Sequence, residues 1–356
     1  SPHFPARAKR VIFLCMRGGP SHMETFDEKP QLLADHGKPG KAPNSKLLGA
    51  RWKFRRHGES GLSIVELLPE TGRHADKLCV LRGMHTDNEN HPQALEQLHT
   101  GSFQFVRPSL GAWTLYGLGT ENQSLPGFIS INPLSALGGL RYYSNAFLPA
   151  AYSATLLGDA NRPVKNPTVG NLANTRLTKA GQRQQLDLLQ AMNRDLLDKG
   201  PDTRVEGLIE SYELAFRMQS AVPEVVDLAQ ETAATQKMYG LDNDATKLAG
   251  QRLLTARRLV ERGVRFVQVF PSPYGVWDSH QKLKDNHTKL CATVDLPVAG
   301  LIQDLKQRGL FDDVTIVFCT EFGRTPGLEQ RAGGKDGRDH HPNGFCVWLA
   351  GAGLKR

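Results

Sequence analysis

Acidic side chains and histidines are concentrated in five short polar clusters, each next to an apolar run of the chain. Carboxylate oxygen and imidazole nitrogen are ligands that proteins use for zinc and related divalent ions. They are also the groups that most often donate or accept protons in catalysis. The clusters span Gly18–Asp27, Met84–Pro92, Val276–His280, Thr320–Pro326 and Asp336–Pro342.

The clearest ligand pair is Asp278 and His280, which are two residues apart. On an extended or turn segment such side chains point the same way and can bind one cation. Asp278 would serve equally well as the N-cap of a following helix. Glu321 directly follows an apolar run, where an acid is poorly placed for packing. We expect Glu321 to be a further ligand, with helix capping as the alternative.

Two adjacent histidines, His340 and His341, follow Asp339. An acid beside an imidazole fixes its tautomer, so this group is expected to supply a metal ligand and its supporting partner. A solvated polar loop is the alternative. His22 is a further candidate ligand and His91 a candidate catalytic group, although either could be an ordinary satisfied or exposed histidine.

Two arginines, Arg324 and Arg338, flank the clusters. A guanidinium group binds carboxylate, phosphate or sulfate oxygens through paired hydrogen bonds. We therefore expect both arginines to bind an anionic part of a substrate, with ordinary surface positions as the alternative.

Short apolar runs rich in β-branched residues alternate with helical patterns along the chain. This alternation predicts an α/β fold with a mostly parallel central sheet flanked by helices. Ligands bind beyond the carboxyl ends of parallel strands, so the polar clusters should meet at one edge of the sheet. The predicted strands span residues 11–16, 77–81, 128–131, 264–270, 314–319 and 345–350.

The middle of the chain has a different composition. Residues 132–174 are rich in Gly, Pro, Asn and Ser and predict long loops, whereas residues 181–262 show helical spacing, most clearly over 211–219 and 245–261. No clean linker interrupts the chain. We therefore predict a single α/β domain over residues 1–356, with a loop-rich and helical insertion at about 132–262.

Composition excludes several classes of protein. The net charge is +8, but Lys and Arg are spread along the chain without interleaved aromatic residues, which argues against nucleic acid and favours an anionic substrate. The five cysteines form no CxxC pair, so neither a zinc ribbon nor a redox motif is predicted. No apolar stretch is long enough to span a membrane. The start has no signal-peptide core, so the protein is either cytoplasmic or has lost an export signal.

Residues 294–323 resemble the alkaline phosphatase and sulfatase superfamily. The predicted helix and strand there lead into Glu321-Phe322-Gly323, which is similar to the Asp-His-Gly ligand turn of the family. Residues 277–280 are similar to its Asp/His metal segment, and residues 340–351 to its late histidine followed by a strand. The resemblance implies an alkaline phosphatase-like three-layer sandwich that binds a divalent metal, Zn, Ca, Mg or Mn.

On this resemblance the metal ligands are Asp278, His280, Glu321 and one of His340 and His341. Nearly the whole chain is also similar to a sulfatase-like branch, the domain of unknown function family 1501. The motifs that carry this likeness are residues 18–22, 26–27, 321–326 and 337–342. Members of that branch commonly carry twin-arginine export signals, which implies a periplasmic or secreted mature protein.

The chain departs from the superfamily where a nucleophile should be. Sulfatases place a cysteine two residues before a proline, and phosphatases place Ser or Thr near the same helix start, whereas this chain has Asn90-His91-Pro92. We expect His91 to attack the substrate or act as a general base, and Asn90 to precede a helix N-terminus that attracts an anion. The first strand also lacks the usual aspartate ligand, and His22 follows it instead.

The leading hypothesis is a metal-dependent hydrolase of phosphate or sulfate esters, on carbohydrate or another anionic substrate. One alternative is a non-catalytic protein that binds anionic glycans, because a familiar nucleophile is missing. Another is a metal-dependent transferase or isomerase of the same superfamily. Substrate, metal identity and oligomeric state do not follow from the sequence.

Overall fold

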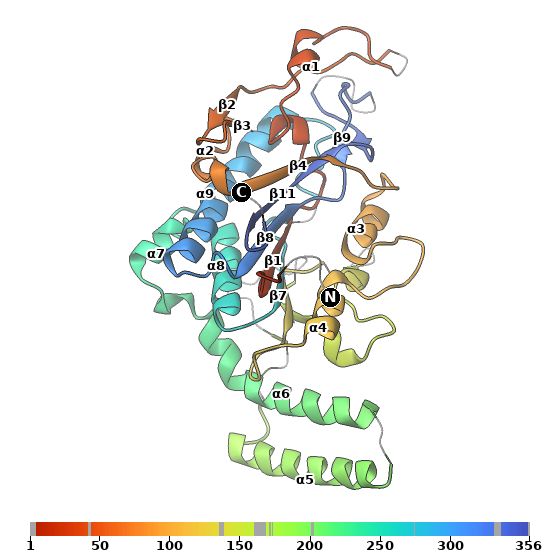
Figure 1. Cartoon of the computed structure of the whole chain (residues 1–356), viewed down its shortest axis with the longest axis vertical. Helices are drawn as coiled ribbons and strands as arrows, with labels where there is room; N and C mark the ends of the chain where they lie inside the picture. Colours follow the sequence, from red (N-terminus) through yellow and green to blue (C-terminus); the bar gives the residue numbers. More distant parts are fainter. Residues whose placement is uncertain are drawn as a thin grey trace.

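The computed structural model describes residues 5–41, 44–134, 139–159, 169–170, 172, 174–200, 203–273, 275–330 and 336–354. Its centre is a seven-stranded sheet with the order β4-β11-β8-β1-β7-β5-β6 (Figure 1). Only β11 runs against its neighbours in this sheet, and the other adjacent pairs are parallel. The strands are β1 Arg10–Cys15, β4 Leu78–Met84, β5 Phe128–Ile131, β6 Thr155–Leu157, β7 Phe266–Val269, β8 Val314–Cys319 and β11 Phe345–Gly351.

Strand β1 lies in the middle of the sheet and is apolar on both faces. Ile12 and Leu14 belong to one buried cluster, whereas Phe13 and Cys15 belong to a second cluster on the other face. Successive side chains of a strand point to opposite faces, so a strand covered on both sides must be apolar throughout. The continuous apolar run in the sequence follows from this double burial.

Helices cover both faces of the sheet. On one face α8 (Lys247–Glu261) packs on β1, β7 and α9 (Leu283–Gln307), with α2 (Pro69–Gly72) and α7 (Ala233–Met238) against α9. On the other face α4 (Leu110–Leu118) packs on β5 and β7, and α3 (His91–Thr100) contributes Leu95 to the same apolar cluster. The predicted mostly parallel sheet flanked by helices is confirmed.

All six predicted strands are present in the structure. The edge strand β6 was not predicted, because it is only three residues long and lies in a segment rich in loop-forming residues. A separate antiparallel hairpin, β2 (Phe54–His57) with β3 (Leu62–Val65), was also missed.

The segment predicted as an insertion contains two kinds of structure. Strand β6 and helix α8 belong to the central sheet and its cover, whereas α5 (Lys179–Asp198) and α6 (Thr203–Val226) form a helical hairpin at one end of the molecule (Figure 1). The single-domain assignment with its insertion remains a prediction. The last short elements are α1 (Pro30–Ala34), β9 (Gly323–Arg324) and β10 (His340–His341), together with the 3-10 turns His22–Glu24, Ala75–Lys77, Gly139–Tyr142, Ala150–Tyr152 and Leu228–Gln230.

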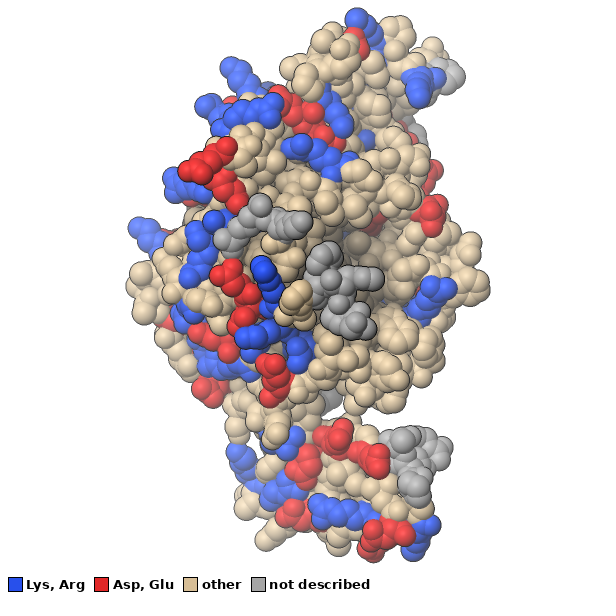
Figure 2. Space-filling model, viewed as in Figure 1, with Lys and Arg blue, Asp and Glu red and all other residues tan. Residues whose placement is uncertain are grey.

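Lysine and arginine are interspersed with aspartate and glutamate over the face of the molecule seen in Figure 2. This view shows no single broad basic surface of the kind that binds nucleic acid. None of the helices in the described part of the chain is long and apolar enough to cross a membrane.

One fully buried ion pair connects three segments near the carboxyl edge of the sheet. Arg338 and Glu24 are both 0 % exposed, with Nη2 of Arg338 2.5 Å from Oε1 of Glu24. Arg338 also donates to the carbonyls of Leu48, at 2.8 Å, and Thr325, at 3.0 Å. Burial raises the pKa of Glu24, but the charge and hydrogen bonds of Arg338 lower it further, so the net pKa lies below its ordinary value. The pair therefore fixes the turn after β1 against Leu48, the residue after β9 and the segment before β10.

We expect the Arg338→Met variant to lose about 3–5 kcal/mol of unfolding free energy, because it leaves the Glu24 carboxylate buried and uncompensated. The Glu24→Leu/Arg338→Met double variant should regain much of this loss. Urea denaturation at neutral pH measures both. An equal loss in the single and double variants would contradict a dominant role for the ion pair.

The Glu24–Arg338 ion pair also makes the stability of the protein depend on pH. The pKa of Glu24 is lowered by folding, so its contribution is complete above the ordinary value of 4.5 and is lost as the pH falls below it. Wild-type stability should therefore decline more steeply than that of the double variant below pH 4.5.

Candidate metal centre

The polar clusters meet at the carboxyl edge of the central sheet. The turn after β1 carries Gly18 and Gly19, the turn after β8 carries Glu321, and α3 begins at His91, seven residues after β4 ends. The segment between β7 and α9 carries Asp278 and His280, and β10, which precedes β11, carries His340. Parallel strands bring residues distant in sequence to one place, as the sequence predicted.

Three imidazole rings converge on the carboxylate of Asp278. Nε2 of His280 lies 3.0 Å from Oδ1 of Asp278, and Nε2 of His340 lies 3.1 Å from the same oxygen. Nε2 of His91 lies 3.3 Å from Oδ2. The two Nε2 atoms of His280 and His340 are 3.0 Å apart. Four chemically reactive side chains therefore share one small volume.

The second nitrogen of each ring, Nδ1, contacts an oxygen atom that holds the ring in place. Nδ1 of His91 lies 2.7 Å from Oε1 of Glu321, and Nδ1 of His280 lies 2.8 Å from Oε2 of Glu329. Nδ1 of His340 lies 2.7 Å from the carbonyl oxygen of Glu89. When Nδ1 of His280 and of His340 carries the hydrogen and donates it to these oxygens, the lone pair of each of their Nε2 atoms faces the centre.

Arg324 holds Asp278 in place from within the protein. Its Nη2 lies 2.7 Å from Oδ1 of Asp278, and its Nε donates to the carbonyl of Gly19 at 2.7 Å. Nη2 also donates to the carbonyl of Gly18 at 2.5 Å, and the side chain is 1 % exposed. The sequence suggested a substrate-binding role, but the structure places this guanidinium beneath Asp278, where it orients the carboxylate.

The register of a two-stranded ribbon decides which of the paired histidines joins the group. Strand β10 pairs antiparallel with β9, and His340 lies opposite Arg324. Directly opposed residues of paired strands point to the same face, so both side chains reach Asp278. His341 points to the other face and accepts from the backbone N–H of Asn343 at 3.4 Å. His340, and not its neighbour, is therefore the histidine at the centre.

The electrostatics of the group favour charged forms. Burial lowers the pKa of His91, but hydrogen bonds with Asp278 and Glu321 and their charges raise it to about 9. Burial raises the pKa of Asp278, while hydrogen bonds from His340 and His91 and the charge of Arg324 lower it well below its ordinary range. Burial likewise raises the pKa of Glu321, and the contact with His91 makes the net shift downward. Both carboxylates are therefore ionised at neutral pH, and His91 carries a proton between them.

The donor atoms fit a divalent metal ion. Lone pairs on His280 and His340 that face each other at 3.0 Å repel unless a proton or a cation lies between them. Zinc bonds of about 2.0–2.1 Å in tetrahedral geometry would place neighbouring ligand atoms about 3.3 Å apart. The corresponding separations among Asp278, His280 and His340 are 3.0–3.1 Å. The described residues offer two candidate ligand groups that share His340, one with His91 and Asp278 and the other with His280 and Asp339.

The centre is open to solvent on one side. The side chains of Asp278 and His280 are each 27 % exposed, whereas Glu321 behind them is fully buried. Phe322 packs beside two of the imidazoles, with its ring centroid 4.7 Å from that of His91 and 4.4 Å from that of His340. Asp278 and His280 are therefore partly accessible to solvent, while the inner side of the centre is packed.

Two consecutive glycines allow this close packing. The backbone N–H of Gly18 donates to Oε1 of Glu321 at 2.8 Å. Gly19 has a φ of +62°, and a Cβ atom there would lie 2.8 Å from the ring of Phe322. Any side chain at Gly19 would displace Phe322 and with it the two imidazoles that it contacts.

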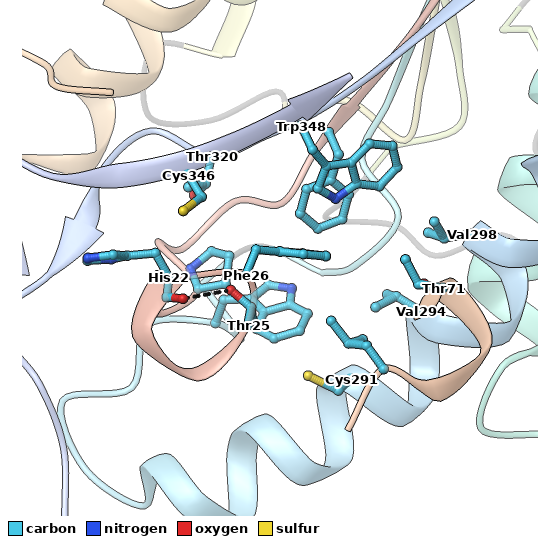
Figure 3. A pocket seen from close by; sticks show the side chains of 14 residues that line it. His22, Thr25, Phe26, Thr71, Cys291, Val294, Val298, Thr320, Cys346 and Trp348 are labelled. Atoms are coloured by element: carbon cyan, nitrogen blue, oxygen red, sulfur yellow. Dashed lines mark hydrogen bonds between the residues drawn. The ribbon is translucent and has the colours of Figure 1, made fainter. Parts of the chain in front are cut away.

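His22 lies apart from this group. Its buried ring packs against β9, since a Cβ atom at Gly323 would lie 2.9 Å from Nδ1 of His22. Burial lowers the pKa of His22 to about 4. Figure 3 shows His22 on the wall of a largely apolar cavity of about 30 Å³, across from Val298 and Thr71. The structure thus does not bring His22 to Asp278, and we assign it no metal.

Three further predicted site residues occupy the surroundings. Glu321 contacts Nδ1 of His91 and is not among the grouped ligand atoms of the described residues. Asn90 is the exposed N-cap of α3, and its side chain makes no capping hydrogen bond. Arg338 forms the buried pair with Glu24, so its guanidinium is not available to a substrate.

Two groups that support the histidines were not predicted from the sequence. Glu329 is buried and orients His280, and the carbonyl of Glu89 orients His340. Glu329 comes five residues after Arg324 in an irregular segment, and no spacing rule connects it with His280. Only the folded chain reveals these contacts.

Comparisons with solved structures find distant likeness. Lipoteichoic acid synthase LtaP from Listeria monocytogenes has a TM-score of 0.40 and 10% identity, over 99% of this chain and 67% of that one. The C-terminal periplasmic domain of EptC from Escherichia coli, in complex with Zn, has a TM-score of 0.39 and 11% identity, over 98% and 74%. TAB5 alkaline phosphatase with bound Mg has a TM-score of 0.39 and 7% identity, over 98% of this chain and 92% of that one. At TM-scores below 0.5 the likeness does not bear on the function of this chain.

No curated protein matches the chain. One family model does, over residues 8–356, and it is described as "Protein of unknown function (DUF1501)". This match covers nearly the whole sequence and confirms the resemblance to family 1501. The chain therefore belongs to the DUF1501 family, a family whose function is not known.

Proposed function

We propose that this protein is a metal-dependent hydrolase of phosphate or sulfate esters. One observation carries the proposal: three imidazoles, each fixed through Nδ1 by an oxygen atom, direct Nε2 toward the ionised carboxylate of Asp278. Fixing the outer nitrogen of a histidine in this way is typical of metal ligands. A buried structural cluster would not need an open side, whereas a catalytic site does.

Asp278, His280 and His340 are the proposed ligands. Two nitrogens and one oxygen favour Zn²⁺ over Mg²⁺ or Ca²⁺, which prefer all-oxygen sites. Three protein ligands would leave a position for water or an ester oxygen, as in catalytic zinc sites. When bound, such an ion activates a water molecule and withdraws charge from the ester.

His91 is proposed as the proton donor to the leaving oxygen. Its Nε2 lies 3.3 Å from Oδ2 of Asp278, and in the metal-free chain hydrogen bonds with Asp278 and Glu321 raise its pKa to about 9. Glu321 accepts from Nδ1, which fixes the ring and stabilises the charged form. A general acid of this kind contributes roughly 10²–10⁴-fold to a reaction. This proposed role differs from the attacking or general-base role that the sequence suggested for His91, because a protonated imidazole has no free lone pair.

The proposed substrate is anionic. The N-terminus of α3 begins at His91, and helix N-terminal N–H groups favour a phosphate or sulfate oxygen. The family resemblance further suggests that the protein acts outside the cytoplasm after export. Binding of an anionic glycan without turnover, and transfer to an acceptor other than water, are the alternatives that assays must separate.

Removal of the central carboxylate provides the first test. The Asp278→Asn variant should bind Zn²⁺ at least tenfold more weakly, because it loses a charged ligand, and should lose at least 100-fold in kcat/KM. Elemental analysis and hydrolysis of p-nitrophenyl phosphate and p-nitrophenyl sulfate measure these effects. Asp244→Asn, at an exposed position before α8, is the control. Metal-free wild-type protein whose activity resists chelators would overturn the proposal, and metal binding without turnover would favour the glycan-binding alternative.

The supporting carboxylate provides a second test. We expect Glu329→Gln to weaken Zn²⁺ binding by about 10–100-fold, because an amide orients Nδ1–H of His280 less firmly than a carboxylate does. Titration against a chromophoric chelator measures the affinity. Glu210→Gln on the exposed side of α6 should bind as the wild type does. An unchanged affinity in Glu329→Gln would remove His280 from the ligand set.

The role of His91 predicts a specific pH dependence. A general acid must be protonated, so kcat should fall as the pH rises through the pKa of His91. That pKa is about 9 in the metal-free chain, and a cation on Asp278 would lower it. The His91→Gln variant should lose this alkaline limb and at least 100-fold in kcat while it keeps metal. A pH profile that is unchanged in the variant would show that another group donates the proton.

A further inference from the structure

Two cysteines face each other at the ends of neighbouring strands in the middle of the central sheet. Cys15 is the last residue of β1, and Cys319 is the last residue of β8. The two strands are parallel, and their register places Cys15 directly opposite Cys319. Both side chains belong to the apolar cluster that includes Leu95 of α3, and each residue is 1 % exposed. The two sulfur atoms therefore lie on the same face and at the same level of the sheet.

The backbone holds these cysteines at a spacing that suits a disulfide. Neighbouring strands lie about 4.7–4.9 Å apart, and the two Cα atoms of a disulfide are about 4.4–6.8 Å apart. The two thiols already share a hydrogen bond, and Sγ of Cys319 donates to the carbonyl of Leu14 at 3.5 Å. Both are free thiols in this structure. A bond between their sulfur atoms therefore needs no change in the pairing of the strands.

The other three cysteines are not paired in this way. Cys79 on β4 lies opposite Leu349 of β11, so it does not face a cysteine. Cys291 on α9 and Cys346 on β11 both line the small cavity of Figure 3, where they lie on separate walls with their sulfur atoms apart. All five cysteines lie in the described part of the chain, so Cys15 and Cys319 form the one opposed pair among them.

Cys15 ionises more readily than the other buried cysteines. Burial raises its pKa, but hydrogen bonds with Cys319 and His99 outweigh burial, so the net pKa lies below its ordinary value. Burial and the contact with Cys15 raise the pKa of Cys319. Burial raises the pKa of Cys346 to about 12 and also raises that of Cys291. Because the thiolate is the form of cysteine that attacks a disulfide, Cys15 is the residue suited to begin an exchange reaction.

We propose that Cys15 and Cys319 form a disulfide that links β1 to β8 when the chain folds in the presence of a small-molecule disulfide. The thiolate of Cys15 attacks one sulfur of the oxidant, which gives a mixed disulfide and releases one thiolate. The thiolate of Cys319 then attacks the sulfur of Cys15 and releases the second thiolate. Two protein thiols are oxidised, and the oxidant is reduced to two thiols that take up the two protons. Both sulfur atoms are buried in the folded sheet, so the exchange takes place while β1 and β8 come together.

The link would lie next to the turns that position the candidate metal centre. The N–H of Met16 donates to the carbonyl of Cys319 at 2.8 Å, and the hydroxyl of Thr320 donates to the carbonyl of Met16 at 3.0 Å. Two residues further on, the N–H of Gly18 donates to Glu321. The disulfide would therefore fix the register of β1 and β8 at the edge from which these turns begin. This cross-link does not depend on which reaction, if any, the centre catalyses.

Refolding of the full wild-type chain tests the proposal directly. Urea-unfolded, reduced protein is refolded in a mixture of reduced and oxidised glutathione, denatured with iodoacetamide to block free thiols, and mapped as peptides without reduction. We expect one joined pair of peptides, which contains Cys15 and Cys319, and blocked thiols at the other three positions. Refolding in dithiothreitol should leave all five cysteines blocked. Five blocked cysteines after refolding in glutathione, or a link that involves a different cysteine, would overturn the proposal.

Stability provides a second measurement with a matched control. A disulfide that closes a long segment restricts the unfolded chain, so the glutathione-refolded protein should have a urea midpoint about 1 M higher than the dithiothreitol-refolded protein. The Cys319→Ala variant should lose this difference, whereas Cys79→Ala on β4 should keep it. An equal difference in the two variants would show that the cross-link is not responsible. If Cys319→Ala does not fold, the peptide map of the wild-type chain still decides the question.

Discussion

The carboxylate of Asp278 is the contact on which the candidate site depends. Arg324 and the three imidazoles all approach its two oxygens, and they come from four different segments of the chain. A carboxylate that faces several nitrogen donors in a partly buried place is stable only when the charges balance. A proton on His91 supplies that balance in the metal-free chain, and a divalent cation would supply it more completely. The geometry is thus already arranged for a positive ion.

The strands around the site hold its charged groups in the positions that this balance of charge requires. Arg324 is fixed to the carbonyls of Gly18 and Gly19 after β1, so the position of Asp278 depends on the first strand of the chain and on β9 near its end. Glu321 receives the N–H of Gly18 and fixes His91 in the same way. Parallel neighbours β1 and β8 therefore determine the distance between the two carboxylates. The site would tolerate little change in the register of these strands.

Much of this arrangement could be predicted from the sequence. The roles of some residues could not, because they depend on tertiary packing. Long apolar runs located the strands, and acids and histidines at their ends pointed to Asp278, His280 and His340. The two flanking arginines could not be distinguished, because burial of Arg338 against Glu24 and of Arg324 beneath Asp278 depends on tertiary packing. The choice of His340 over His341 likewise depends on the pairing of β9 with β10, which two-residue strands do not reveal in advance.

The contacts around His91 determine what its imidazole can do in the proposed reaction. Proline at the second position of α3 and Phe322 beside the ring leave the imidazole one orientation, with Nδ1 on Glu321 and Nε2 toward the centre. A histidine fixed between two carboxylates keeps its proton at neutral pH, so it lacks the lone pair needed to attack and is present in the form that can donate a proton. In the proposed reaction His91 would donate a proton to the leaving oxygen while a water molecule attacks, so a covalent enzyme intermediate would not be needed.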